Sequence, residues 1–137
     1  MTRYLPLCLA LLASTAFAQD RPSPLDGNWS GRSDGGSCNA PLDYQVSIDT
    51  GIVDGTASDS SAHGPVPNLK KTAPPPPTPG LWQIHGIARG NAFSLIFVAS
   101  VQGTQRRESR LSVTVQGATL VVTEQGGCAR KATLTKG

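Results

Sequence analysis

The sequence predicts an all-β protein, and three observations lead to this class. Apolar residues recur at every second position through most of the chain, which is typical of strands with one buried face. The apolar runs are short, and glycine-containing turns such as Arg89-Gly90-Asn91 separate them. No stretch carries apolar residues at helical spacing. We therefore expect one antiparallel up-and-down barrel of about eight strands, with a β-sandwich as the alternative.

Three strands are predicted in the first part of the domain. The first covers Gly27–Ser33, and the second covers Leu42–Asp49, where apolar and polar residues alternate strictly. Thr50 and Gly51 supply a turn, and the third strand follows at Ile52–Ala57.

Five further strands are predicted in the second part. The segment Ala92–Val101 is apolar at consecutive positions, so we expect it to be the most buried strand. The other four show alternation bounded by glycine turns. They cover Trp82–Ala88, Arg107–Val115, Ala118–Glu124 and Arg130–Thr135.

Residues 1–18 have the pattern of a secretory signal peptide. A positive start at Arg3 precedes the apolar run Leu5–Ala13, and a small-residue cleavage site ends at Ala18. Cys8 lies within the run and is expected to leave with the peptide. The run is shorter than the ~20 residues of a membrane span. We expect an exported protein, secreted or in a bacterial periplasm, without a membrane span.

Cleavage after Ala18 leaves 119 of the 137 residues, enough for one domain with one core. We expect a flexible N-terminal arm at 19–26 and a barrel domain at 27–137, present as a monomer. Only Cys38 and Cys128 remain after cleavage, and an exported protein is expected to oxidise them to one disulfide. This bridge would join the end of the first strand to the start of the last and close the barrel.

A proline-rich insertion at 63–80 interrupts the strand pattern. It holds seven of the chain's eleven prolines, and proline donates no backbone hydrogen bond to a sheet. We expect a long loop with an extended polyproline II centre, which is either a recognition segment or an insertion without function. The candidate partner-binding residues are Lys70, Lys71, Pro74, Pro75, Pro76 and Pro77.

Charge is unevenly distributed along the chain. Residues 19–69 carry 2 basic and 7 acidic side chains, whereas residues 70–137 carry 9 basic and 2 acidic ones. If the early and late strands lie apart in the barrel, one side of the barrel is acidic and the other is basic. The alternative is that both are ordinary solvated faces without a partner. The basic residues are not interleaved with aromatic ones, which argues against a nucleic-acid partner.

The sequence contains no catalytic or cofactor motif, so we expect a protein that is not an enzyme and needs no cofactor. Neither His63 nor His85 has a cysteine, histidine or carboxylate at metal-ligand spacing. His85 is expected on an outward strand face. Asp54 and Asp59 precede a serine- and histidine-containing segment, but no nucleophile elbow accompanies them.

The tripeptide Gly27-Asn28-Trp29 on the first strand resembles the opening of calycin-type barrels, the group that includes lipocalins, avidins and small periplasmic metalloprotease inhibitors. The resemblance implies that Trp29 closes one barrel end. It also implies that a basic side chain of the last strand, Arg130 or Lys131, lies across the Trp29 ring, a contact worth about 0.5–2 kcal/mol.

The departures from these families limit what the resemblance implies about function. The chain has only two tryptophans, Trp29 and Trp82, so biotin binding as in avidins is not implied. Its cysteines are further apart than those of the periplasmic inhibitors, which act through a free N-terminal arm. We expect a non-enzymatic binding protein that contacts an unknown protein partner through exposed loops. The alternatives are a periplasmic protease inhibitor and a carrier of a small apolar ligand inside the barrel.

Overall fold

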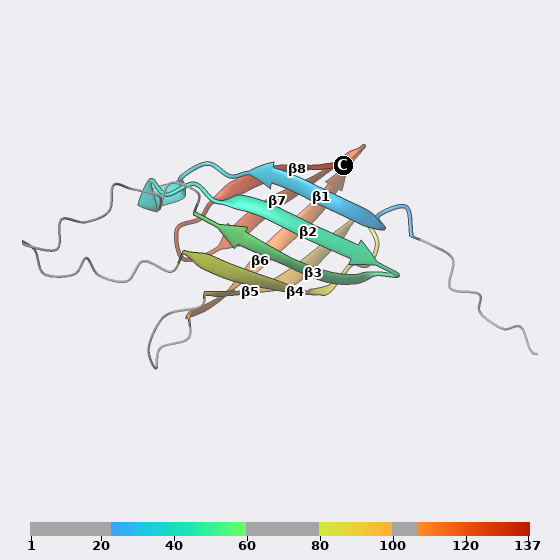
Figure 1. Cartoon of the computed structure of the whole chain (residues 1–137), viewed down its shortest axis with the longest axis horizontal. Helices are drawn as coiled ribbons and strands as arrows, with labels where there is room; N and C mark the ends of the chain where they lie inside the picture. The colour runs from blue at the N-terminus through green and yellow to red at the C-terminus, as the bar shows by residue number, and fades with distance from the viewer. Residues whose placement is uncertain (1–22, 60–79, 100–106) are drawn as a thin grey trace, which may run out of the picture.

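The computed structural model describes residues 23–59, 80–99 and 107–137. Within them, eight antiparallel strands form one closed barrel in which each strand pairs with its neighbours in sequence (Figure 1). The all-β class and the up-and-down barrel are confirmed. The strands are β1 (Gly27–Arg32), β2 (Asp43–Asp49), β3 (Ile52–Ser58), β4 (Leu81–Ile87), β5 (Ala92–Ala99), β6 (Arg107–Gln116), β7 (Thr119–Gln125) and β8 (Lys131–Lys136), with a 3-10 helix, η1 (Gly36–Cys38), after β1.

The predicted strands match the observed ones to within one residue at each described boundary. The last part of the predicted strand Ala92–Val101 lies outside the described residues. The short helix η1 was not predicted, because three residues are too few to show a periodic pattern. Among the described residues, no helix has the length and apolar character that a membrane crossing requires.

Side chains fill the interior of the barrel. The inward positions of all eight strands form one apolar cluster that includes Tyr44, Ile84 and Phe97. At the centre remains a cavity of about 10 Å³, which is about the space of a single water molecule. The prediction for the fifth strand is confirmed: β5 has four buried residues, more than any other described strand, although Ile96 on its outward face is 44% exposed.

The barrel closes where β1 meets β8. In this seam Trp29 pairs with Lys136 and Ser30 with Thr135. The backbones approach closely at Gly31, where a Cβ atom would collide with the Thr133 carbonyl oxygen. Only glycine fits such an approach without a shift of the neighbouring strand.

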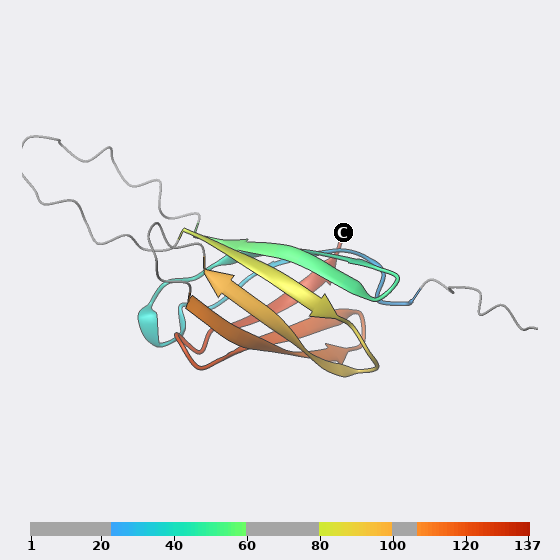
Figure 2. The ribbon, with the colours of Figure 1, turned by 90° about the horizontal axis from the view of Figure 1, so that it is seen from below.

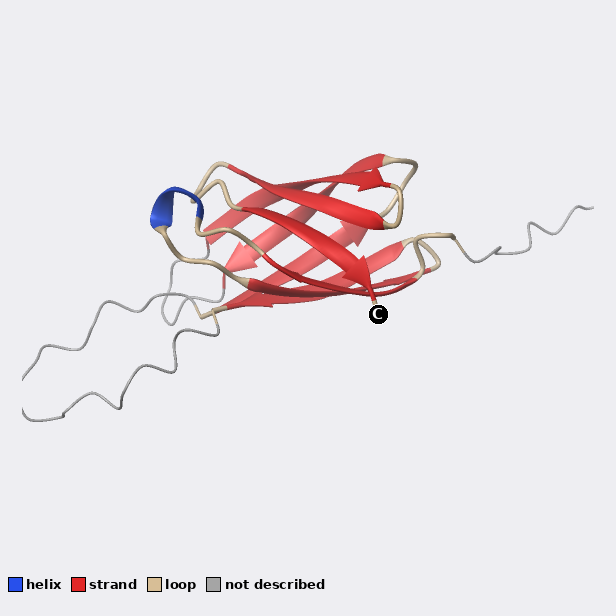
Figure 3. Cartoon of the chain, turned by 90° about the horizontal axis from the view of Figure 1, so that it is seen from above, coloured by secondary structure: helices blue, strands red, loops and turns tan. Residues whose placement is uncertain are grey.

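The two ends of the barrel differ. The helix η1 and the disulfide lie at one end, which we call the disulfide end, and the C-terminus lies at the other, which we call the Trp29 end (Figure 3). The hairpin turn between β4 and β5 is also at the Trp29 end (Figure 2).

Trp29 closes its end of the barrel as predicted, but the basic residue beside it is a different one. The indole is 4% exposed, and its Nε1 donates a hydrogen bond to the Leu25 carbonyl oxygen at 2.8 Å. Lys136 Nζ lies 5.8 Å from the ring centroid. Placing Arg130 or Lys131 over Trp29 was wrong, because Trp29 pairs with the end of β8, whereas Lys131 begins that strand and Arg130 precedes it.

The described part of the predicted arm packs against the Trp29 end. Leu25 is buried in the apolar cluster. The Asp26 carboxylate accepts a hydrogen bond from the Ser23 backbone N–H at 2.9 Å. An arm that extends freely is therefore confined to positions before Ser23, which lie outside the described residues.

We predict that Trp29→Ala lowers the free energy of unfolding by about 3–5 kcal/mol, because a large buried side chain is lost. The control is Ile52→Ala, at a position that is 59% exposed, for which we expect a change below about 1 kcal/mol. Urea unfolding followed by circular dichroism measures both. Equal losses for the two variants would contradict the role of Trp29 as a closing residue.

Candidate functional site

The predicted disulfide between Cys38 and Cys128 is present. The two residues are 90 positions apart in sequence and have a Cα–Cα distance of 5.2 Å. The bond ties η1 to the turn between β7 and β8. In the chain-entropy model, a closed loop of this size stabilises the fold by about 4 kcal/mol.

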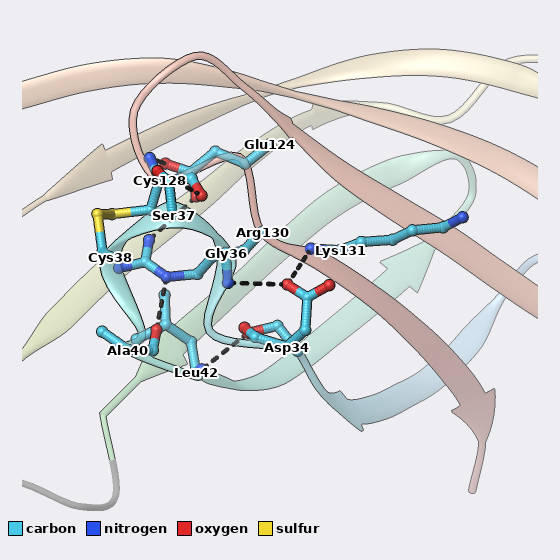
Figure 4. A network of polar contacts seen from close by, with 11 residues as sticks. Asp34, Gly36, Ser37, Cys38, Ala40, Leu42, Glu124, Cys128, Arg130 and Lys131 are labelled. Carbon is cyan, nitrogen blue, oxygen red and sulfur yellow. Dashed lines mark hydrogen bonds and ion pairs between the residues drawn. A yellow bond between two sulfur atoms is a disulfide. The ribbon is translucent and has the colours of Figure 1, made fainter.

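Hydrogen bonds hold the same two segments together (Figure 4). The Asp34 carboxylate accepts from the Lys131 backbone N–H at 3.0 Å and from the Gly36 N–H at 3.1 Å. The Ser37 N–H donates to the Cys128 carbonyl oxygen at 2.8 Å. Gly36 has a φ of +57°, and a Cβ atom there would collide with that same carbonyl. Glycine is therefore required where η1 touches the β7–β8 turn.

A buried ion pair lies beneath these segments. Arg130 Nη1 donates to Glu124 Oε2 at 3.0 Å, and the two side chains are only 6% and 1% exposed. Arg130 Nε also donates to the Ala40 carbonyl oxygen at 2.7 Å. The hydrogen bonds offset part of the free energy needed to remove both charges from water. The pair thereby fixes the chain between η1 and β2 above the barrel.

Trp82 is the aromatic residue of the disulfide end. The Arg130 Cζ atom lies 5.9 Å from a Trp82 ring centroid. Trp82 also stacks on Phe97, with a centroid distance of 4.3 Å. Arg130, one of the two residues predicted to lie over Trp29, therefore lies over Trp82 at the opposite end of the barrel.

The polar groups at this end also affect Tyr44, which is buried next to Phe97. Burial raises the pKa of the Tyr44 phenol well above its usual value, and the negative charge of Glu124 adds to the shift. The phenol therefore stays neutral under ordinary conditions.

A hollow of about 590 Å³ opens above Trp82 at this end, and we call it the mouth hollow. The disulfide and the ion pair form part of its wall, and β6 forms the opposite side. The lining residues are Cys38, Ala40, Leu42, Asp59, Trp82, Arg107, Glu108, Ser109, Glu124, Gly127, Cys128 and Arg130.

Two connections join strands at the disulfide end. Residues 60–79 join β3 to β4, and residues 100–106 join β5 to β6. Their own positions lie outside the described residues. The predicted partner-binding residues are therefore not placed, although the strand ends that carry the proline-rich segment border the mouth hollow at Asp59. The unplaced residues are Lys70, Lys71, Pro74, Pro75, Pro76 and Pro77.

His85 faces outward, as predicted, and pairs with a residue that sequence spacing did not reveal. Its Nδ1 lies 2.8 Å from Asp54 Oδ1, and both side chains are more than half exposed. This contact exists because β3 and β4 place the two residues opposite each other. In the described part of the chain, no group of three or more histidine, cysteine or acidic residues is arranged to hold a metal ion.

Sequence reasoning missed Glu124, Trp82 and Lys136 as members of the two barrel ends. Glu124 could have been found, because it continues the inward alternation of Leu120 and Val122 along β7. A carboxylate at an inward position requires a buried partner.

Comparison of the chain with family models, curated proteins and solved structures found no significant match.

We predict that Glu124→Gln lowers the free energy of unfolding by about 3–5 kcal/mol, because it leaves the Arg130 charge buried without its partner. The matched control is Asp43→Asn, which breaks the exposed ion pair with Arg32 and should cost less than about 1 kcal/mol. Urea unfolding of the oxidised protein measures both. A loss for Glu124→Gln no larger than that of the control would show that the pair does not stabilise the fold.

We further predict that Tyr44 ionises only far above the usual pH of about 10 while the protein is folded. A raised pKa means that the folded state holds the phenolic proton more tightly than the unfolded state, so stability falls as the pH rises above about 10. In a protein that starts at Gln19, Tyr44 is the only tyrosine. The near-ultraviolet absorbance of phenolate therefore reports on it alone. Titration of the folded protein near pH 10 would contradict the burial of the phenol.

Proposed function

We propose that this chain is a small exported binding protein that contacts a macromolecular partner through the disulfide end of its barrel and performs no catalysis. The mouth hollow is the observation that carries this proposal. Its volume of about 590 Å³ falls within the range of about 300–1,000 Å³ that is typical of small-molecule sites, so it has room for a side chain of a larger partner. The long connection at 60–79 starts and ends beside it, which supports a contact surface larger than the hollow.

The filled interior supports this proposal over a carrier of an apolar ligand. A ligand inside the barrel would have to enter a core with about 10 Å³ of free volume. Close-packed interiors accept added atoms only with strain or displacement of side chains. Binding at an end of the barrel requires neither.

Calycin-like architecture is part of the proposal, supported by the closed eight-stranded barrel and by the buried Trp29 on β1. A protease inhibitor that acts through a free N-terminal arm receives less support. Leu25 and Asp26 are held against the barrel, which leaves only the positions before Ser23 for such an arm.

Site-specific crosslinking tests the proposal. A photoreactive phenylalanine analogue is placed at Leu81, at the disulfide end of β4, or at Ile87, at the Trp29 end of the same strand. Both side chains are exposed, at 43% and 53%, so the positions are matched. In the exported fraction we expect a discrete crosslinked partner from position 81 only. A further variant, in which a short glycine turn replaces residues 65–80, should no longer form the crosslink from position 81.

Equal crosslinking from both positions, or none from position 81, would contradict binding at the disulfide end. A small molecule that co-purifies inside the barrel would instead favour the carrier. Persistence of the crosslink in the shortened variant would show that the proline-rich segment does not contribute.

A further inference from the structure

A second hollow lies at the Trp29 end of the barrel, and we call it the Trp29 hollow. Its volume is about 580 Å³, which falls within the range of about 300–1,000 Å³ for small-molecule sites. The segment before β1, the β4–β5 turn, the β6–β7 turn and the end of β8 form its walls. Figure 2 shows the first two of these at the same end of the barrel. Because Trp29 closes the barrel beneath it, a ligand here leaves the filled core undisturbed.

The lining of this hollow carries charge of one sign only. Of its eleven described residues, Lys136 is the only charged one. The mouth hollow differs, because carboxylates and guanidinium groups line it together. The Trp29 hollow therefore presents a single positive charge beside a largely apolar surface. The apolar residues of this surface are Pro24, Leu25, Trp29, Ala88, Val115 and Ala118.

Contacts with β1 and the segment before it place the Lys136 ammonium at the edge of the hollow. Gly27 has a φ of +136°, and a Cβ atom there would collide with Lys136 Cε, so the glycine leaves room for the lysine stem against β1. Nζ lies 5.8 Å from the Trp29 ring centroid and 3.5 Å from the Pro24 carbonyl oxygen. Both of these neighbours line the hollow.

The ammonium has hydrogen-bonding capacity left. It carries three N–H donors, and its contact with Pro24 is at the outer limit of a hydrogen bond. Within the described residues Lys136 forms no ion pair. The Asp26 carboxylate instead accepts hydrogen bonds from the backbone N–H groups of Ser23 and Gly51. An anionic group in the hollow would therefore meet a cation that has no acidic partner.

The single cation favours a ligand with a single negative charge. One ammonium balances one carboxylate, whereas a phosphate monoester carries a charge of about −1.5 to −2. Part of that charge would remain unpaired beside apolar side chains, which is unfavourable. Ala88 and Val115 favour an apolar ligand body, because their contact with it removes apolar surface from water.

We propose that the Trp29 hollow binds a monocarboxylate with an apolar body. The carboxylate lies beside Lys136 Nζ, and the apolar body covers Ala88 and Val115. A free aliphatic acid and the C-terminal residue of an apolar peptide share this chemistry. The site is at the opposite end from the proposed partner surface, so the inference does not depend on the proposed function.

Two pairs of probes test the inference and distinguish these two sources. Hexanoate and hexanamide represent the aliphatic acid and its uncharged analogue, and N-acetylleucine and N-acetylleucinamide represent the peptide end and its uncharged analogue. Titration of the isotope-labelled oxidised protein, followed by backbone amide NMR shifts, gives both the affinity and the place of binding. We expect shifts around Trp29, Ala88 and Val115. In at least one pair the carboxylate should bind about three- to fivefold more tightly than the amide, as for an accessible ion pair, and the pair with the larger preference identifies the source.

Lys136→Met removes the charge and keeps an unbranched side chain against Gly27 and Trp29. We expect it to abolish the preference for the carboxylate and to leave the affinity for the amide unchanged. The matched control is Lys131→Met, which removes an exposed lysine at the other end of the same strand and should leave the preference intact. Lys136→Arg keeps the charge and should keep the preference.

The unaltered protein provides a measurement that does not depend on the folding of a variant. Raising the salt concentration from about 0.01 M to about 1 M shortens the Debye length from about 30 Å to about 3 Å. The preference for the carboxylate should then disappear, because it arises from the charge of Lys136. The affinity for the amide should change little.

Absence of binding by both carboxylates, equal affinity within both pairs, or shifts centred on the disulfide end would overturn the inference. An equal loss of preference in Lys131→Met would also overturn it, because the charge of Lys136 would then have no particular role. None of these results would affect the proposed function, which the crosslink from position 81 tests at the opposite end of the barrel.

Discussion

Closure of the sheet between its first and last strands is the constraint on which the rest of this structure depends. An open edge leaves backbone groups unpaired, and a closed barrel removes both edges. The β1–β8 pairing is short, with Trp29 opposite Lys136, Ser30 opposite Thr135 and an isolated bridge from Ser33 to Ala132. The disulfide and the hydrogen bonds of Asp34 continue the seam past the end of β1. The disulfide and the backbone hydrogen bonds therefore both hold the barrel closed.

Both ends of the barrel are closed by a tryptophan with a cation beside its ring, but the cations differ in their surroundings. Lys136 is exposed, so its charge remains hydrated and needs no partner. Arg130 is 5% exposed and needs the Glu124 carboxylate and the Ala40 carbonyl in place of water. Burial of charge is unfavourable unless such partners are provided. The disulfide end thus holds polar chemistry that the Trp29 end lacks.

Local pattern was sufficient to predict the strands, because alternation and turn residues are properties of a few adjacent positions. The disulfide could be predicted because only two cysteines follow residue 18. Which basic residue lies beside Trp29 could not be predicted, because it depends on the register between β1 and β8, which no local pattern determines. The Glu124–Arg130 pair depends in addition on the turn between them, where Gly126, Gly127 and Ala129 adopt positive φ.

The filled core limits the places on this protein where a ligand could bind. An eight-stranded barrel has an interior just wide enough for side chains to fill or for one small ligand. Here Phe97 stacks with both Trp82 and Tyr44, at centroid distances of 4.3 and 6.1 Å, and aliphatic side chains occupy the remainder. Any ligand that entered would have to displace this stack. In the proposed function, a partner therefore binds at the outer surface or the ends of the barrel, and the disulfide end holds the mouth hollow.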